Sequence, residues 1–323
     1  MAHTKNALKN LFSLVIIIGV AFFFYNSFQV NRTALQSYAL KLNYIFLVLS
    51  FVFVVITYLL STCGWQLALN SLSGTNRISF SQSIAVVNTS SLIKYIPGKI
   101  WSYALQMYWL ANAGFLKSVI VYVNLVNLFV SIMTSLIVGL GFMLFSPVIV
   151  PVAVFSPLLL FLILFDIFFI KYNARVTPGM ISLVNRVFNL DITCLVVSHR
   201  LIMYLHLIHY AAAFSFGISA YLLCHGIGIE VGPGKALLVM ASLLLSDVIG
   251  FLAVIVPGGL GVREGIMYLL LNNVSTVSLS LMLPVASRIV GMFADITLGT
   301  IAFVLLKYRM PASAVRENAR TAK

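Results

Sequence analysis

Residues 43–70 read NYIFLVLSFVFVVITYLLSTCGWQLALN and contain no charged side chain. About 20 consecutive apolar residues are enough for a helix to cross the hydrocarbon core of a bilayer. The run is also far longer than the roughly 10-residue alternating segments that form the strands of a membrane β-barrel. It therefore predicts a membrane-spanning α-helix and an all-α fold.

The same pattern recurs along the chain, because hydrophobic residues make up 61% of its 323 positions and charged residues only 8%. Mean hydropathy is +1.07, whereas a soluble domain is about 45–50% apolar and about 25% charged. We therefore expect a polytopic membrane protein with about six transmembrane helices, and a hydrophilic loop at residues 171–196. The expected spans are residues 8–28, 43–70, 118–145, 148–170, 200–224 and 277–306.

Two further apolar segments are each broken by a Pro-Gly pair. They are residues 80–96 with 100–112, joined at Pro97-Gly98, and residues 236–256 with 260–272, joined at Pro257-Gly258. Proline removes a hydrogen-bond donor from a helix and disfavours helical backbone immediately before it. We expect two re-entrant hairpins, which are tolerated at membrane depth where protein or a water-filled cavity covers them. Two kinked, fully spanning helices are the alternative.

The two breaks belong to an internal repeat. A shift of 160 residues places Pro97-Gly98 on Pro257-Gly258 and Gly139 on Gly299. Each half then has the order long span, short segment, break, short segment, long span. We expect a single transmembrane domain that contains both halves. Its bounds are residues 1–306, with repeat 1 at about 43–145 and repeat 2 at about 200–306.

Basic residues predict the orientation, because cytoplasmic loops are enriched in Lys and Arg. This rule places both termini in the cytoplasm, including a basic tail at residues 307–323. Spans 43–70 and 200–224, which begin the two repeats, then run in opposite directions. We therefore expect an inverted repeat in the cytoplasmic (inner) membrane, a recurring plan among transporters with broken helices.

Charged side chains within the apolar segments are few, and each costs about 2.5–3.5 kcal/mol on insertion scales. Arg263 and Glu264 follow the second break, where Gly258 and Gly259 permit close backbone approach. The N-terminus of the following helix favours anions. We expect Arg263 to bind a phosphate group, with Glu264 as its partner or as a titrating group. A structural ion pair that locks the hairpin is the alternative.

Three more charged residues are candidates in the second half. Arg288 and Asp295 are seven residues apart, on one face of a predicted helix, and Asp247 lies in the first arm of the second hairpin. We expect a buried network, in which Arg288 contacts substrate while Asp247, Asp295 and Glu264 are candidates for ion or proton coupling. Purely structural pairing is the alternative. Asp166 is expected at the membrane interface.

In the first hairpin, Lys94 and Lys99 flank the break and are candidates for collecting an anionic headgroup. Snorkelling to the cytoplasmic interface is the alternative for both lysines. Trp101 and Tyr103 are candidate substrate contacts, and an interfacial aromatic belt explains them equally well.

Other classes of function are disfavoured. The net charge of +13 is better explained by topology anchors than by nucleic-acid binding, because no soluble basic domain is present. His206 and His209 share a helix face but have no third ligand at metal spacing. No hydrolase, zinc-protease or nucleotide-binding motif occurs. We therefore expect no enzyme activity, no metal and no cofactor.

Several of these residues carry a resemblance to a known family. Trp65, Lys94–Lys99 (KYIPGK), Ala113-Gly114-Phe115 and above all residues 257–265 (PGGLGVREG) resemble the lysylphosphatidylglycerol synthase transmembrane region family, over about residues 40–305. The resemblance implies movement of lipids between leaflets, such as aminoacylated phosphatidylglycerol or polyprenyl-phosphate-linked sugars. Bifunctional members carry a soluble aminoacyltransferase domain after this region. Since only 17 residues follow position 306, lysyl transfer is not expected.

The expected function is therefore that of a lipid translocase (flippase) for an anionic or lipid-linked headgroup. A membrane-embedded transferase that uses Glu264 or Asp247 on a lipid-linked substrate is one alternative. A non-transporting partner in envelope glycan or lipid synthesis is another. The expected partners are membrane lipids and, in addition, lipid- or glycan-synthesis enzymes.

Overall fold

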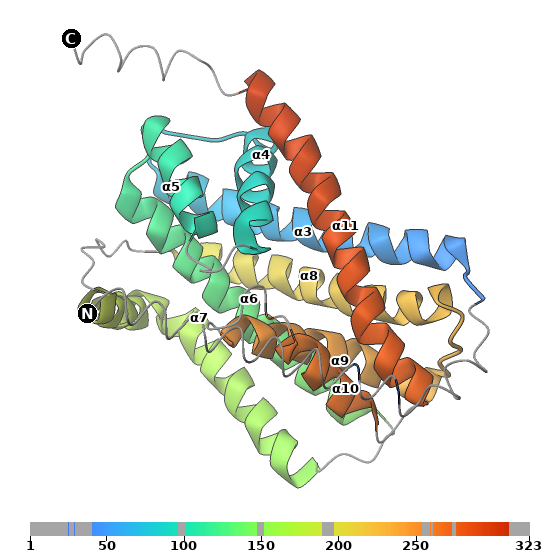
Figure 1. Cartoon of the computed structure of the whole chain (residues 1–323). Helices are drawn as coiled ribbons and strands as arrows, with labels where there is room; N and C mark the ends of the chain where they lie inside the picture. Colours follow the sequence, from blue (N-terminus) through green and yellow to red (C-terminus); the bar gives the residue numbers. More distant parts are fainter. Residues whose placement is uncertain are drawn as a thin grey trace, which may run out of the picture.

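A computed structural model describes residues 25, 29, 41–95, 101–146, 152–188, 197–253, 259, 261–272 and 276–309. These residues form nine α-helices and one 3₁₀ helix, with no strand among them, and the predicted all-α fold is confirmed (Figure 1). The helices are α3 (Tyr44–Leu72), α4 (Phe80–Ser91), η1 (Leu92–Tyr95), α5 (Trp101–Asn112), α6 (Lys117–Phe145), α7 (Val152–Phe188), α8 (His199–Gly226), α9 (Pro233–Leu252), α10 (Val262–Asn272) and α11 (Val277–Arg309).

Six of these helices are long and apolar enough to cross a membrane: Tyr44–Leu72, Lys117–Phe145, Val152–Leu183, His199–Gly226, Pro233–Leu252 and Leu279–Leu305. Five of them correspond to predicted spans. The first predicted span, residues 8–28, lies outside the described residues. The sixth is α9, which the sequence suggested as the short first arm of a hairpin. With 20 residues, α9 has the length that a full crossing needs.

The predicted hydrophilic loop at residues 171–196 is wrong up to residue 188, because α7 continues through it. The backbone kinks at Tyr172, where φ is −113°, and then resumes as helix. Asn173, Thr177 and Ile181 are buried at intervals of four residues. This spacing forms one buried helix face, which a reading based on average polarity does not detect.

Helices α3 and α8 form an antiparallel pair, and they lie side by side in Figure 1. The backbone N–H of Asn43, at the start of α3, donates to the carbonyl of Gly226, at the end of α8, over 2.9 Å. Further along, Ser50 Oγ donates to Ser219 O (2.8 Å) and Ser215 Oγ donates to Phe53 O (2.9 Å). Small and hydroxylated residues favour this close approach of membrane helices. The predicted opposite directions of these two spans are confirmed.

A short helix of each repeat packs on the last long helix of the other repeat. Helix α4 packs on α11, while its counterpart α9 packs on α6. Gly139 of α6 accommodates a leucine of α9, since a Cβ there would lie 2.9 Å from Leu245 Cδ2. Gly299 of α11 accommodates Leu92 of η1 in the same way, at 2.6 Å from its Cδ1. The two glycines that the 160-residue shift superposes thus have equivalent packing roles.

Candidate functional site

A polar cavity of about 410 Å³ lies where the two halves meet. Both broken helix pairs contribute to its wall, together with α3, α6, α8 and α11, whereas α7 contributes no lining residue. The polar and aromatic lining residues are Tyr58, Ser61, Thr62, Trp65, Asn88, Ser90, Ser91, Ser102, Tyr103, Gln106, Asn124, Asn127, Ser131, His209, Asp247, Arg263, Arg288 and Asp295. This volume lies within the range of about 300–1,000 Å³ that is typical of small-molecule sites.

Arg263 is held at the cavity wall by an ion pair across the second break. Its Nη1 lies 2.8 Å from Asp247 Oδ1 of α9. Gly250, one turn further along α9, allows α10 to approach, because a Cβ there would lie 2.9 Å from Arg263 Cβ. Gly259 has a φ of +66°, and a Cβ on it would lie 2.7 Å from Gly250 O. Only glycine fits this backbone conformation without strain.

Glu264 joins α10 to α11 through an ion pair with Arg288. Its Oε1 accepts a hydrogen bond from Arg288 Nη1 over 2.7 Å, and its Oε2 accepts one from the Gly261 N–H over 2.6 Å. The Glu264 residue is buried, and the second bond caps the N-terminus of α10. The sequence suggested Glu264 as the partner of Arg263. The ion pairs instead link Arg263 to Asp247 and Arg288 to Glu264.

Arg288, Asp247 and Asp295 all line the same cavity, as expected from their spacing. Asp295 is buried, and the Tyr58 hydroxyl of α3 donates a hydrogen bond to its carboxylate. The cavity therefore holds two arginines and two carboxylates on its wall, with the Glu264 carboxylate directly behind Arg288. Its charges nearly balance, so the site is polar without a strong excess of either sign.

The first broken pair contributes polar, uncharged groups. Tyr103 and Gln106 of α5 line the cavity, whereas Trp101 is 57% exposed and is not a lining residue. Gln106 Nε2 donates to Ser90 Oγ over 2.8 Å, and its buried Oε1 has no hydrogen-bond partner among the described residues. The described residues do not include Lys99, Gly258 or the side chain of Lys94.

The sequence analysis did not predict the amide and hydroxyl side chains that line the cavity. Asparagines of α6 join helices: Trp65 Nε1 of α3 donates to Asn124 Oδ1 over 2.9 Å. Asn127 Oδ1 lies 3.3 Å from His209 Nε2. These groups also line the cavity. Polar residues spaced along apolar runs on several helices are the signal that could have indicated this.

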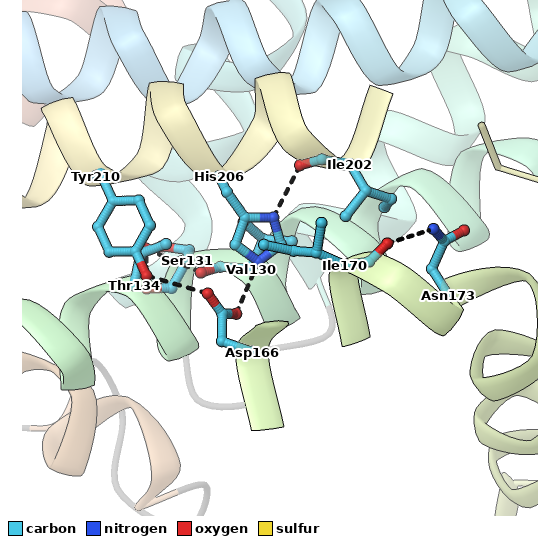
Figure 2. Close-up of polar contacts among 9 residues, drawn as sticks. All are labelled: Val130, Ser131, Thr134, Asp166, Ile170, Asn173, Ile202, His206 and Tyr210. Carbon is cyan, nitrogen blue, oxygen red and sulfur yellow. Dashed lines mark hydrogen bonds and ion pairs between the residues drawn. The ribbon is translucent and has the colours of Figure 1, made fainter. Parts of the chain in front are cut away.

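A second polar cluster lies outside the cavity. Asp166 of α7, which was expected at the membrane interface, is buried inside the protein and bonded to His206 and Tyr210 of α8 (Figure 2). Its position relative to the bilayer stays a prediction. The sequence signal was an acidic residue in one apolar span and histidines in another.

The fold and this site define a polytopic α-helical membrane protein with a cavity lined in part by polar and charged side chains. The family model described as "Lysylphosphatidylglycerol synthase TM region" matches residues 10–299. The chain belongs to this family. Comparisons with curated proteins and with solved structures gave no match.

Proposed function

We propose that the protein translocates a lipid between membrane leaflets, with the polar headgroup in the cavity and the acyl or prenyl chains in the bilayer. The observation that carries this proposal is the contrast between the cavity and the outer surface. The cavity wall is rich in hydroxyls, amides and ion pairs, while outward-facing side chains such as Leu160 and Phe161 are apolar and exposed. A lipid has this same division between headgroup and tails.

The lining groups suit a headgroup with both phosphate and hydrogen-bonding substituents. Arg263 offers a planar guanidinium for phosphate, and its partner Asp247 can release it to a stronger acceptor. Gln106 Oε1 offers a buried acceptor that lacks a protein donor. Trp65 and Tyr103 offer aromatic faces for a sugar or an aminoacyl group. Aminoacylated phospholipids and polyprenyl-phosphate-linked sugars both have this chemistry.

The proposed movement follows from an inverted repeat in the inner membrane, with both termini in the cytoplasm. Antiparallel α3 and α8 support this arrangement, as does the exchanged packing of α4 on α11 and α9 on α6. Related halves of this kind favour alternating access around a fixed midplane site. The two Pro-Gly breaks would then face opposite leaflets and open in turn.

We propose transport rather than catalysis at this site. Glu264, one of the carboxylates considered for a transferase, has both oxygens engaged, by Arg288 and by the Gly261 N–H. A general base needs an oxygen that is available to the reacting proton. The lipid would come from a membrane-bound synthesis enzyme, which is the proposed partner.

The test is a leaflet assay with purified protein in lipid vesicles. Labelled aminoacylated phosphatidylglycerol, phosphatidylglycerol and a polyprenyl-phosphate sugar would be offered, and the fraction that reaches the opposite leaflet would be measured. We expect translocation of at least one of them. Tyr103→Ala should lower its rate at least tenfold, because Tyr103 lines the cavity.

The matched control is Trp101→Ala, which removes an exposed aromatic side chain two residues away on the same helix. Its rate should stay within about twofold of the wild type. No translocation of any candidate by a folded protein, or equal losses in the two variants, would contradict the proposal.

A further inference from the structure

The cluster of Asp166, His206 and Tyr210 contributes no residue to the cavity lining (Figure 2). His206 Nε2 lies 2.8 Å from Asp166 Oδ1, and Tyr210 donates from its hydroxyl to Asp166 Oδ2 over 3.0 Å. Asp166 is 3% exposed and His206 is 2% exposed. Ionisable side chains within membrane-spanning helices are costly and tend to be functional or paired.

The hydrogen bonds of His206 determine how many protons the pair holds. Its Nδ1 lies 2.8 Å from the carbonyl oxygen of Ile202, which can only accept, so Nδ1 carries a proton. Nε2 faces Asp166 Oδ1, and a 2.8 Å contact needs a proton between these two atoms. Either the ring is an imidazolium beside a carboxylate, or a neutral ring accepts from a carboxylic acid. In both forms the pair holds one proton that can leave.

Loss of that proton would place the Nε2 lone pair against a carboxylate oxygen and leave one uncompensated negative charge. Helix α8 contributes Tyr210 to the cluster and, one turn before it, His206, with His209 directly before Tyr210 in the sequence. In the part of the chain that the structure describes, no lysine or arginine pairs with Asp166. The contact between α7 and α8 therefore depends on the proton.

A polar connection leads from this pair to the cavity. His209 is one turn along α8 from His206, lines the cavity and contacts Asn127. Ser131 of α6, labelled in Figure 2, also lines the cavity.

We propose that Asp166 and His206 form a proton-binding site that couples the cavity to a proton gradient. A proton leaves the Nε2–Oδ1 contact toward His209 and the cavity, and the pair separates. Helix α7 then moves relative to α8. The outer face of α7 allows this movement, because Leu164 and Ile167 are 58% and 56% exposed. The coupling role rests on the proposed translocation, whereas the proton site itself does not.

The proton site can be tested without transport. Protein in nanodiscs, labelled with ¹⁵N at its five histidines, would be measured at pH 7.5, where a free histidine is neutral. We expect either an imidazolium signal for His206 or the infrared band of a protonated carboxyl for Asp166. The signal should vanish in Asp166→Asn. A neutral His206 ring beside an ionised Asp166 would overturn the proposal.

The coupling role is tested in vesicles with an imposed pH gradient. Wild-type translocation should change at least threefold with the direction of the gradient, and Asp166→Asn should translocate without this response. The double variant Asp166→Leu with His206→Phe replaces the pair by apolar groups and keeps the packing. If that variant retains the response, the pair is a structural link only and the coupling is refuted. Absence of all transport alongside a positive spectroscopic result would refute the proposed translocation and the coupling, and leave the proton site standing.

Discussion

Arg263 and Glu264 are neighbours in the sequence, and yet they pair with different helices. The two ion pairs also differ in burial. The side chains of Arg288 and Glu264 are 16% and 9% exposed, whereas those of Arg263 and Asp247 are 20% and 47% exposed. The more buried pair has a structural role in fixing α10 to α11, and the more open pair can exchange its partner for a ligand.

Two matched substitutions test this difference. Glu264→Gln should lower the free energy of unfolding by about 3 kcal/mol, since it removes the charge of a buried carboxylate that lies 2.7 Å from Arg288 Nη1. Asp247→Asn should cost less than about 1 kcal/mol, because its carboxylate is half exposed and screened. Thermal unfolding of the detergent-solubilised variants measures both. Equal shifts would contradict the assignment of separate roles.

The residue types at the site could be predicted from the sequence, but their pairing could not. Charges within apolar runs are rare enough to single out Asp247, Arg263, Glu264, Arg288 and Asp295. Which of them meet depends on the angle at which α10 returns along α9, and Gly250 and Gly259 set that angle through contacts remote in sequence. The burial of Asp166 inside the protein was not predicted, because its partner His206 lies 40 residues away in the sequence.

At the scale of the helices, the long apolar runs predicted α3, α6, α8 and α11 to within a few residues. The predictions failed where the average polarity of a segment does not indicate its local structure. The second half of α7 is polar on average and is nevertheless a helix, because a single face of it packs on the core. Helix α9 continues for 20 residues before it ends at Leu252. It is therefore long enough to be a candidate membrane span, although a Pro-Gly break follows it in the sequence.

The close contact between α6 and α9 gives a prediction at this scale. Gly139→Ala should destabilise the protein by about 1–3 kcal/mol, because the added Cβ overpacks against Leu245. Gly141→Ala, two residues along the same helix, meets nothing within 4 Å and should stabilise the helix by up to about 1 kcal/mol. Melting temperatures measure both effects.

Leu245→Ala supplies the control, since it should relieve the Gly139→Ala clash in a double variant. Destabilisation by Gly139→Ala that persists unchanged in the double variant would show that the clash lies elsewhere.

At the scale of the whole molecule, antiparallel α3 and α8 place their C-terminal ends at opposite sides of the bundle. Thr75, after α3, and Glu230, after α8, are both exposed. Single cysteines at these positions, in a background without the three native cysteines, should react with a membrane-impermeant maleimide from opposite sides. We expect Glu230→Cys to react in intact cells and Thr75→Cys only after permeabilisation.

Labelling of both cysteines from one side would refute the inverted arrangement. The two cysteines are each other's control, because each reports whether the membrane was intact in the experiment with the other.

Helices α3 and α8 begin the two repeats and pack on each other. This contact has a consequence for how such a molecule could arise. A polypeptide of half the length, containing only the first repeat, would expose the face of α3 that α8 now covers. A second copy inserted upside down would present an equivalent helix to that face, and each copy would lend its broken pair to the other. Gene fusion of two such dual-topology subunits would fix the stoichiometry. It would also free the two copies to diverge, one toward amides and hydroxyls and the other toward arginines and carboxylates.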